Sequence, residues 1–167
     1  MKIILLIGAL AFSTIAVAQH KDHDHSSHEG HAHHWVHDHQ NELGLALNPT
    51  YMISEGEFAP GLHLHYVHYL KNTKWGAGLG YEQIYDDHSH RTAGVILAYR
   101  PIPRLVFIAA PGVTFEAAHP DELAPAIHFE STYEFMLGPI HLGPAVEYAW
   151  DPNDQHFSIG LHFGYGF

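Results

Sequence analysis

The chain has 167 residues, a formal net charge of −11 at pH 7 and no cysteine. The negative charge argues against nucleic acid and anionic lipid headgroups as partners. The absence of cysteine excludes disulfides, thiolate metal sites and a cysteine-linked lipid anchor. No stretch beyond residue 18 approaches the run of about 18 apolar residues that a membrane-spanning helix needs.

Residues 1–18 have the features of a secretory signal peptide. Lys2 supplies the positive start, residues 3–17 form an apolar run, and Ala16-Val17-Ala18 offers small residues at the cleavage site. Cleavage there removes Lys2, so the formal charge changes from −11 to −12. We therefore expect the chain to be exported.

Residues 19–40 are dominated by histidine with interleaved acids, and Trp35 and Val36 are the only large apolar residues among them. Such a segment cannot form a core, so we predict a disordered arm. Neutral imidazole suits Zn, Cu, Ni and Co, and carboxylates can complete the coordination shell. The predicted ligands of the arm are His20, Asp22, His23, Asp24, His25, His28, His31, His33, His34, His37, Asp38 and His39. The alternative is a solvated spacer whose histidines are incidental.

From residue 41 onward, large apolar residues alternate with polar or small ones. Successive side chains of a β-strand point to opposite faces, so this period of two predicts strands with one apolar face. The eight predicted strands are 42–48, 58–70, 75–85, 91–100, 104–115, 123–136, 139–150 and 156–167.

The last predicted strand carries the most regular alternation. Its apolar positions are Phe157, Ile159, Leu161, Phe163, Tyr165 and Phe167. The stretch resembles the closing strand of bacterial outer-membrane β-barrels, which often ends on a terminal Phe. The resemblance implies an all-β fold, an eight-stranded antiparallel up-and-down transmembrane β-barrel (41–167) with a disordered N-terminal arm. It also implies a monomer surrounded by outer-membrane lipid, with the arm in the periplasm.

The connections between the predicted strands alternate in length. The shorter ones are 71–74, 101–103 and 137–138, and the longer or more charged ones are 49–57, 86–90, 116–122 and 151–155. Outer-membrane barrels have short periplasmic turns and longer outer loops in this alternation. Pro111, Pro125 and Pro144 fall inside predicted strands. Because proline removes a ladder hydrogen bond, we expect bulges or strand ends there.

Charged and imidazole side chains occupy the face opposite the apolar one. The predicted luminal network is His63, His65, Glu82, Arg100, Arg104, His128, Glu130, Glu134, His141, Glu147 and His162. An eight-stranded barrel is just wide enough for its own side chains, which favours a packed polar interior with Arg100 and Arg104 paired to glutamates. The alternative is an internal metal or proton site, for which His63 and His65 project to the same side of one strand.

The connection after the third predicted strand repeats the chemistry of the arm. Asp86, Asp87, His88 and His90 combine an H-x-H spacing with two carboxylates, and we count them among the candidate metal ligands.

The sequence thus favours a small outer-membrane barrel that binds or buffers divalent transition-metal ions through the arm. It could pass ions to a metal efflux or uptake system, and no obligatory cofactor is implied. The alternative is a structural or adhesive barrel without a metal role. We expect no enzyme activity, because Ser89 between His88 and His90 is the only candidate nucleophile and sequence adjacency is not triad geometry. A soluble lipocalin-type barrel would need its apolar face inside.

Overall fold

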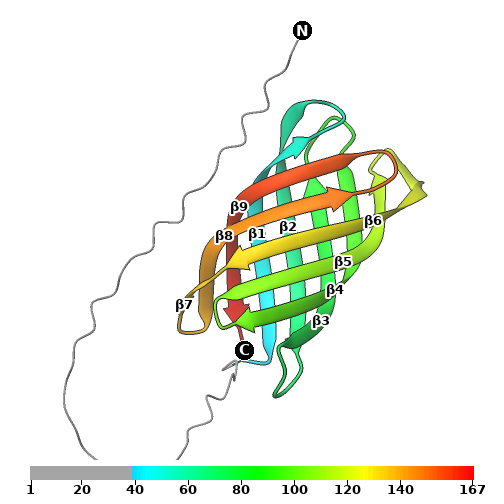
Figure 1. Cartoon of the computed structure of the whole chain (residues 1–167). Coiled ribbons are helices and arrows are strands. Elements are labelled where there is room, and N and C mark those ends of the chain that lie inside the picture. The colour runs from blue at the N-terminus through cyan, green and yellow to red at the C-terminus, as the bar shows by residue number, and fades with distance from the viewer. Residues whose placement is uncertain (1–38) are drawn as a thin grey trace, which may run out of the picture. The chain divides into compact units, whose positions relative to one another are not determined.

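A computed structural model describes residues 39–167, so the predicted signal peptide and the arm up to Asp38 lie outside the described residues. The described residues form a β-barrel that closes on itself (Figure 1). No helix within this range is long and apolar enough to cross a membrane. The strands are β1 (Asn41–Met52), β2 (Glu57–Tyr69), β3 (Trp75–Ile84), β4 (His90–Ile102), β5 (Leu105–Glu116), β6 (His119–Tyr133), β7 (Phe135–Leu137), β8 (Ile140–Trp150) and β9 (Gln155–Gly166).

Every pairing in the barrel is antiparallel, and β1 closes the ring by pairing with β9. Strands β6 and β7 together occupy one strand position of the barrel, because both pair with β8 in the same register. Thr132 lies opposite Ala145, and Phe135 lies opposite Leu142. The interruption is Glu134, whose backbone N–H donates to the carbonyl of Arg104. The predicted fold class, an eight-stranded antiparallel all-β barrel, is confirmed.

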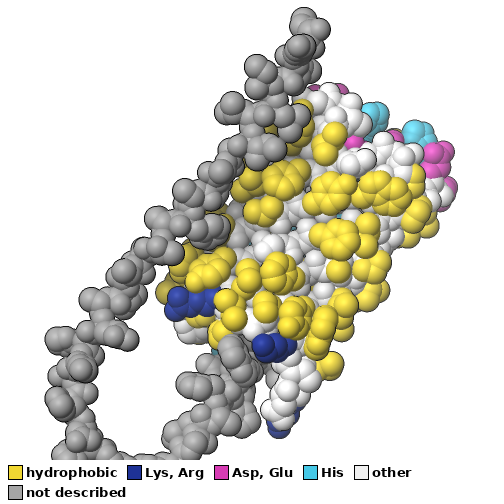
Figure 2. All heavy atoms as spheres, in the orientation of Figure 1, with side chains coloured by type: hydrophobic (Ala, Val, Ile, Leu, Met, Phe, Trp, Pro, Cys, Tyr) yellow, Lys and Arg dark blue, Asp and Glu magenta, His cyan; other side chains and the backbone are white. Residues whose placement is uncertain are grey.

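The apolar positions of the alternation face outward. Leu47 and Leu161, which are partners in the β1–β9 ladder, each keep 61% of their surface exposed. Figure 2 shows apolar side chains spread over the visible wall of the barrel. An outward apolar surface of this extent is what a lipid-facing barrel requires, since the hydrocarbon core accepts only apolar side chains at low cost.

Charge separates between the two ends of the barrel (Figure 2). Lys71, Lys74 and Arg104 lie in the connections 70–74 and 103–104, at what we call the basic end. The opposite end, which we call the acidic end, is formed by the connections 53–56, 85–89, 117–118 and 151–154. Asn41 and Phe167 meet at the basic end, where each backbone N–H donates to the other residue's carbonyl.

Two connections at the acidic end are shorter than predicted. The ladder between β1 and β2 continues through Thr50 and Met52, so the predicted loop 49–57 shrinks to a turn at 53–56. Strand β6 begins at His119, inside the predicted loop 116–122. The prediction of long outer loops was wrong here. Main-chain hydrogen bonding extends the hairpins through residues whose polar side chains suggested a loop.

The prolines also lie differently from the prediction. Pro111 pairs with Ile127, Pro125 with Val113 and Pro144 with Leu161, all inside regular ladders. The two register shifts occur elsewhere, between Tyr99 and Ile102 and between Thr114 and Glu116. Pro144 does lie beside the interruption that separates β6 from β7, where the loss of a ladder donor costs least.

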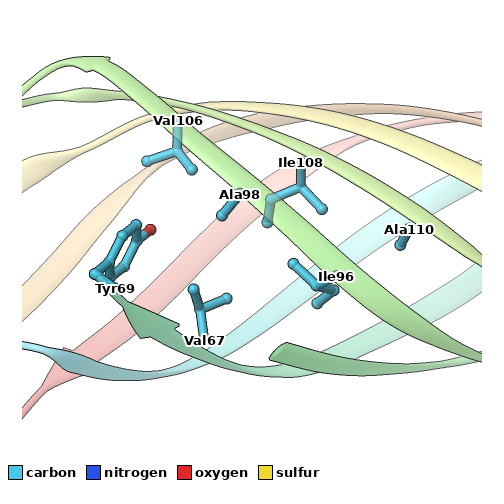
Figure 3. Packing of buried hydrophobic residues seen from close by; sticks show 7 residues of the cluster. All are labelled: Val67, Tyr69, Ile96, Ala98, Val106, Ile108 and Ala110. Carbon is cyan, nitrogen blue, oxygen red and sulfur yellow. The ribbon is translucent and has the colours of Figure 1, made fainter. Parts of the chain in front are cut away.

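One wall of the interior is apolar, which the sequence did not predict. A buried cluster comes from β2, β4 and β5 and points into the barrel (Figure 3). Its members are Val67, Tyr69, Ile96, Ala98, Val106, Ile108 and Ala110. This wall lowers the local dielectric constant beside the polar groups of the lumen, which strengthens their electrostatic interactions.

Candidate metal centre

The strand period of two directs a series of histidines and glutamates into the barrel. On β2, His63 and His65 face inward while His68 is exposed on the outer surface. Ten of the eleven predicted luminal residues are buried: His63, His65, Glu82, Arg100, His128, Glu130, Glu134, His141, Glu147 and His162. The eleventh, Arg104, is exposed in the β4–β5 turn. The predicted strand 104–115 included Arg104, but β5 begins at Leu105, so this side chain lies just outside the strand.

Four buried side chains meet nearest the acidic end, and we call them the outer cluster: Glu82, His128, Glu147 and His156. Strands β6, β8 and β9 supply three of them from one stretch of wall. Glu82 reaches across the lumen from β3, which pairs with none of those three strands. Each of the four offers one ligand atom, and these atoms all lie within 4.8 Å of one another.

The distances in the outer cluster are short. The Oε2 of Glu82 lies 3.4 Å from the Nε2 of His156 and 3.5 Å from the Nδ1 of His128. The Nδ1 of His128 lies 2.7 Å from the Oε1 of Glu147. Within the described residues, the Oε2 of Glu82 and the Nε2 of His156 have no hydrogen-bond partner.

A second group lies next to the outer cluster, and we call it the central cluster: His63, His65, Glu130 and His162. The Nδ1 of His63 is 3.1 Å from the Oε2 of Glu130. The imidazoles of His65 and His162 stack with their centroids 5.1 Å apart and their planes 9° from parallel. His63 connects this group to the outer cluster, because its Nδ1 is 3.8 Å from the Oε2 of Glu147.

The third group lies toward the basic end and is organised by Arg100. Its guanidinium donates to Glu134 at 2.6 Å, to Glu42 at 3.1 Å and to the hydroxyl of Tyr69 at 3.0 Å. His141 approaches the same carboxylates, with its Nδ1 3.2 Å from Glu42. We call these residues the arginine cluster. It is an ion-pair network of the kind that buried charges require.

Negative charge exceeds positive charge inside the barrel. The three clusters together hold five glutamates and one arginine, a formal charge of −4 when the imidazoles are neutral. Buried carboxylates need a counter-charge, which either protonated histidines or bound cations can supply. Because two of the carboxylates share Arg100, the excess is concentrated in the outer and central clusters.

The loop candidates at the acidic end divide into separate pairs. His90 contacts the carboxylate of Asp86, and Asp87 is exposed. His88 lies instead between Glu55 and Glu116, at 3.8 and 3.6 Å. This group is solvent-accessible, with the side chain of His88 54% exposed. Desolvation and the nearby carboxylates of Asp86 and Glu57 raise the pKa of Glu55 above its usual range.

Among the predicted arm ligands, only His39 is described, and His20 to Asp38 lie outside the described residues. The ring of His39 lies against Gly166 at the basic end. The predicted luminal network lacked Glu42 and also His156, the first residue of the predicted strand 156–167, although both precede an outward apolar residue, Leu43 and Phe157. The alternation alone could have assigned them to the inner face.

No protein-family model matches this sequence, and the search of curated proteins finds no match. Solved structures do match. Neisserial surface protein A superposes with a TM-score of 0.56 at 9% identity, over 76% of this chain and 96% of that chain. Ail of Yersinia pestis, in complex with the heparin analogue sucrose octasulfate, gives 0.53 at 13% identity, over 76% and 97%.

This chain has the fold of a small outer-membrane β-barrel. A de novo designed transmembrane β-barrel also superposes on it, with a TM-score of 0.51 at 15% identity, over 74% of this chain and 93% of that chain. Because all three identities are low, the likeness concerns the fold. What the interior binds depends on its own residues, which the fold alone does not specify.

Proposed function

We propose that this protein is an outer-membrane β-barrel that binds divalent transition-metal ions (Zn, Cu, Ni or Co). The outer cluster is the defined site, and the histidine-rich arm adds weaker sites. The outward apolar surface and the fold shared with outer-membrane barrels support the location. The signal peptide and the periplasmic position of the arm are parts of the same proposal, as is delivery of ions to an efflux or uptake system.

The observation that carries the proposal is the spacing of ligand atoms in the outer cluster. Ligands bound at 2.0–2.1 Å to a tetrahedral zinc ion lie about 3.3 Å from one another. The separations of Glu82 from His156 and from His128 are 3.4 and 3.5 Å, whereas the 2.7 Å contact of His128 with Glu147 is a hydrogen bond that an ion would have to replace. Two imidazoles and two carboxylates form a donor set suited to these ions, and a divalent cation would neutralise both glutamates.

Substituting His128 tests the site. A zinc titration of the purified protein in detergent micelles should show the tightest binding step weakened at least tenfold in His128→Gln, because one of four ligands is lost. His68→Gln is the matched control, since it removes an exposed imidazole from the outer surface and should titrate like the parent protein. Equal titrations of His128→Gln and the parent protein would leave a packed polar interior as the better description.

Deleting residues 20–38 tests the arm separately. The deletion should remove the weaker steps of the zinc titration at pH 7.5 and leave the tightest step in place. The difference between the full and shortened chains should disappear as the pH falls through about 6.5, because protons then compete for the imidazole nitrogens. If both chains titrate identically at pH 7.5, the arm has no role in binding.

An adhesive or structural role is the second candidate, supported by the fold that the chain shares with a surface protein and an attachment protein. The negative charge of the acidic end determines which kind of partner an adhesive surface could bind. The carboxylates of Glu55 and Glu116 would repel a sulfated polyanion such as the one bound to Ail. An adhesive surface here would therefore have to recognise a cationic partner, and deletion of the arm would leave the metal tolerance of cells unchanged.

A further inference from the structure

We infer that the central cluster is a second, deeper site for a divalent transition-metal ion, with His63, His65 and Glu130 as its ligands. Each of the three offers one ligand atom within 4.8 Å of the other two, and each side chain is at least 95% buried. The site extends the proposed function from one luminal ion to two. This inference rests on the proposed function, because the central cluster lies next to the outer cluster that is proposed to bind the first ion.

Buried ligand atoms in the central cluster indicate that a group binds there. Within the described residues, the Nδ1 of His65 has no hydrogen-bond partner, and the Nδ1 of His63 and the Oε2 of Glu130 lie 3.1 Å apart without the geometry of a hydrogen bond. Leaving such atoms buried and unsatisfied is costly, so a group that binds them would stabilise the barrel. A bound cation satisfies nitrogen and carboxylate atoms together and also compensates the carboxylate charge, which a neutral water molecule does not do.

The charge around Glu130 distinguishes it from the other deep carboxylates. Glu42 and Glu134 both accept hydrogen bonds from Arg100, so their charge is partly compensated. The described contacts of Glu130 are His63 and the hydroxyl of Thr132, neither of which is a permanent cation. With one divalent ion in each of the outer and central clusters, the formal charge of −4 in the lumen is neutralised.

Glycines provide the space for the imidazoles of the central cluster. A Cβ at Gly44 would lie 2.1 Å from the Nε2 of His65 and 2.7 Å from the Nε2 of His162. A Cβ at Gly80 would lie 3.3 Å from the Nε2 of His63. Alanine at position 44 would therefore push two rings aside without removing any ligand, because the atoms it meets are the tips of side chains and not backbone.

Counting retained zinc tests the second site in the full chain. Purified protein in detergent micelles is loaded with zinc, passed through a gel-filtration column containing a weak chelator, and analysed for zinc per chain. Glu130→Gln should retain one ion fewer than the parent protein, and so should His128→Gln, while the double variant should retain two fewer. Gly44→Ala should also retain one fewer, and the control His68→Gln should match the parent. A shift in electrophoretic mobility on heating establishes that each variant is folded.

The outcomes separate the two sites. If Glu130→Gln or Gly44→Ala retains as much zinc as the parent while His128→Gln loses one ion, the central site is overturned and the outer site stands. If His128→Gln also retains the parent number, the proposed function fails as well.

Discussion

Leu161→Arg should destabilise the barrel in a lipid bilayer by about 2–4 kcal/mol, the cost of placing a guanidinium on the lipid face near the bilayer midplane. Leu161 lies in the middle of β9, is 61% exposed and is flanked by the equally exposed Leu47. The measurement is urea-dependent folding into phosphatidylcholine vesicles, followed by the fluorescence of Trp75 and Trp150. A soluble barrel would tolerate the same substitution, because an exposed Arg is well hydrated.

Tyr165→Arg is the matched control, on the same face of the same strand but near the basic end. There the cost should fall to about 0–1 kcal/mol, because the guanidinium can reach the headgroups. Equal effects at the two positions, or no effect at either, would contradict a lipid-facing surface.

Arg100→Met should destabilise the barrel by about 3–5 kcal/mol, the usual cost of removing one partner from a buried ion pair. The guanidinium is 5% exposed and donates to both Glu42 and Glu134, whose carboxylates would be left without a permanent cation. The same folding measurement checks this value. Combining the substitution with Glu134→Gln should recover part of the loss, because one of the two uncompensated charges is then removed.

Arg104→Met is the corresponding control. Its side chain is exposed in the β4–β5 turn, so the change should stay within about 0.5 kcal/mol. If the two substitutions cost the same, Arg100 does not organise the inner network.

Much of the fold could be predicted because each strand carries its own alternation. The predicted strand 156–167 agrees within one residue with β9, where apolar and small or polar residues alternate without a break. The predicted strand ends were wrong where main-chain hydrogen bonding continues beyond the last residue of the apolar alternation. Polar residues near Thr50 and His119 suggested loops, yet the ladder continues through them. Arg104 was assigned inward because the predicted strand began one residue too early, and the alternation does not mark where the turn ends.

The interior was predictable in its composition but less so in its arrangement. The predicted inward positions included every histidine and glutamate of the three clusters except Glu42 of β1 and His156 of β9. Inward positions of β4 and β5 hold Ile96, Val106 and Ile108, and both faces of these strands are apolar. The alternation gives only a weak signal when both faces of a strand are apolar, so the sequence did not predict the apolar wall of Figure 3.

The sequence by itself determined which side of each strand faces outward, because the geometry of a strand places neighbouring residues on opposite faces. It also determined that imidazoles and carboxylates would share the inner face. Only the tertiary structure decided which of them meet. Glu82 reaches His128 and His156 across the lumen from a strand that pairs with neither of theirs. Such contacts depend on ring closure and on the register of every ladder, which are properties of the whole barrel.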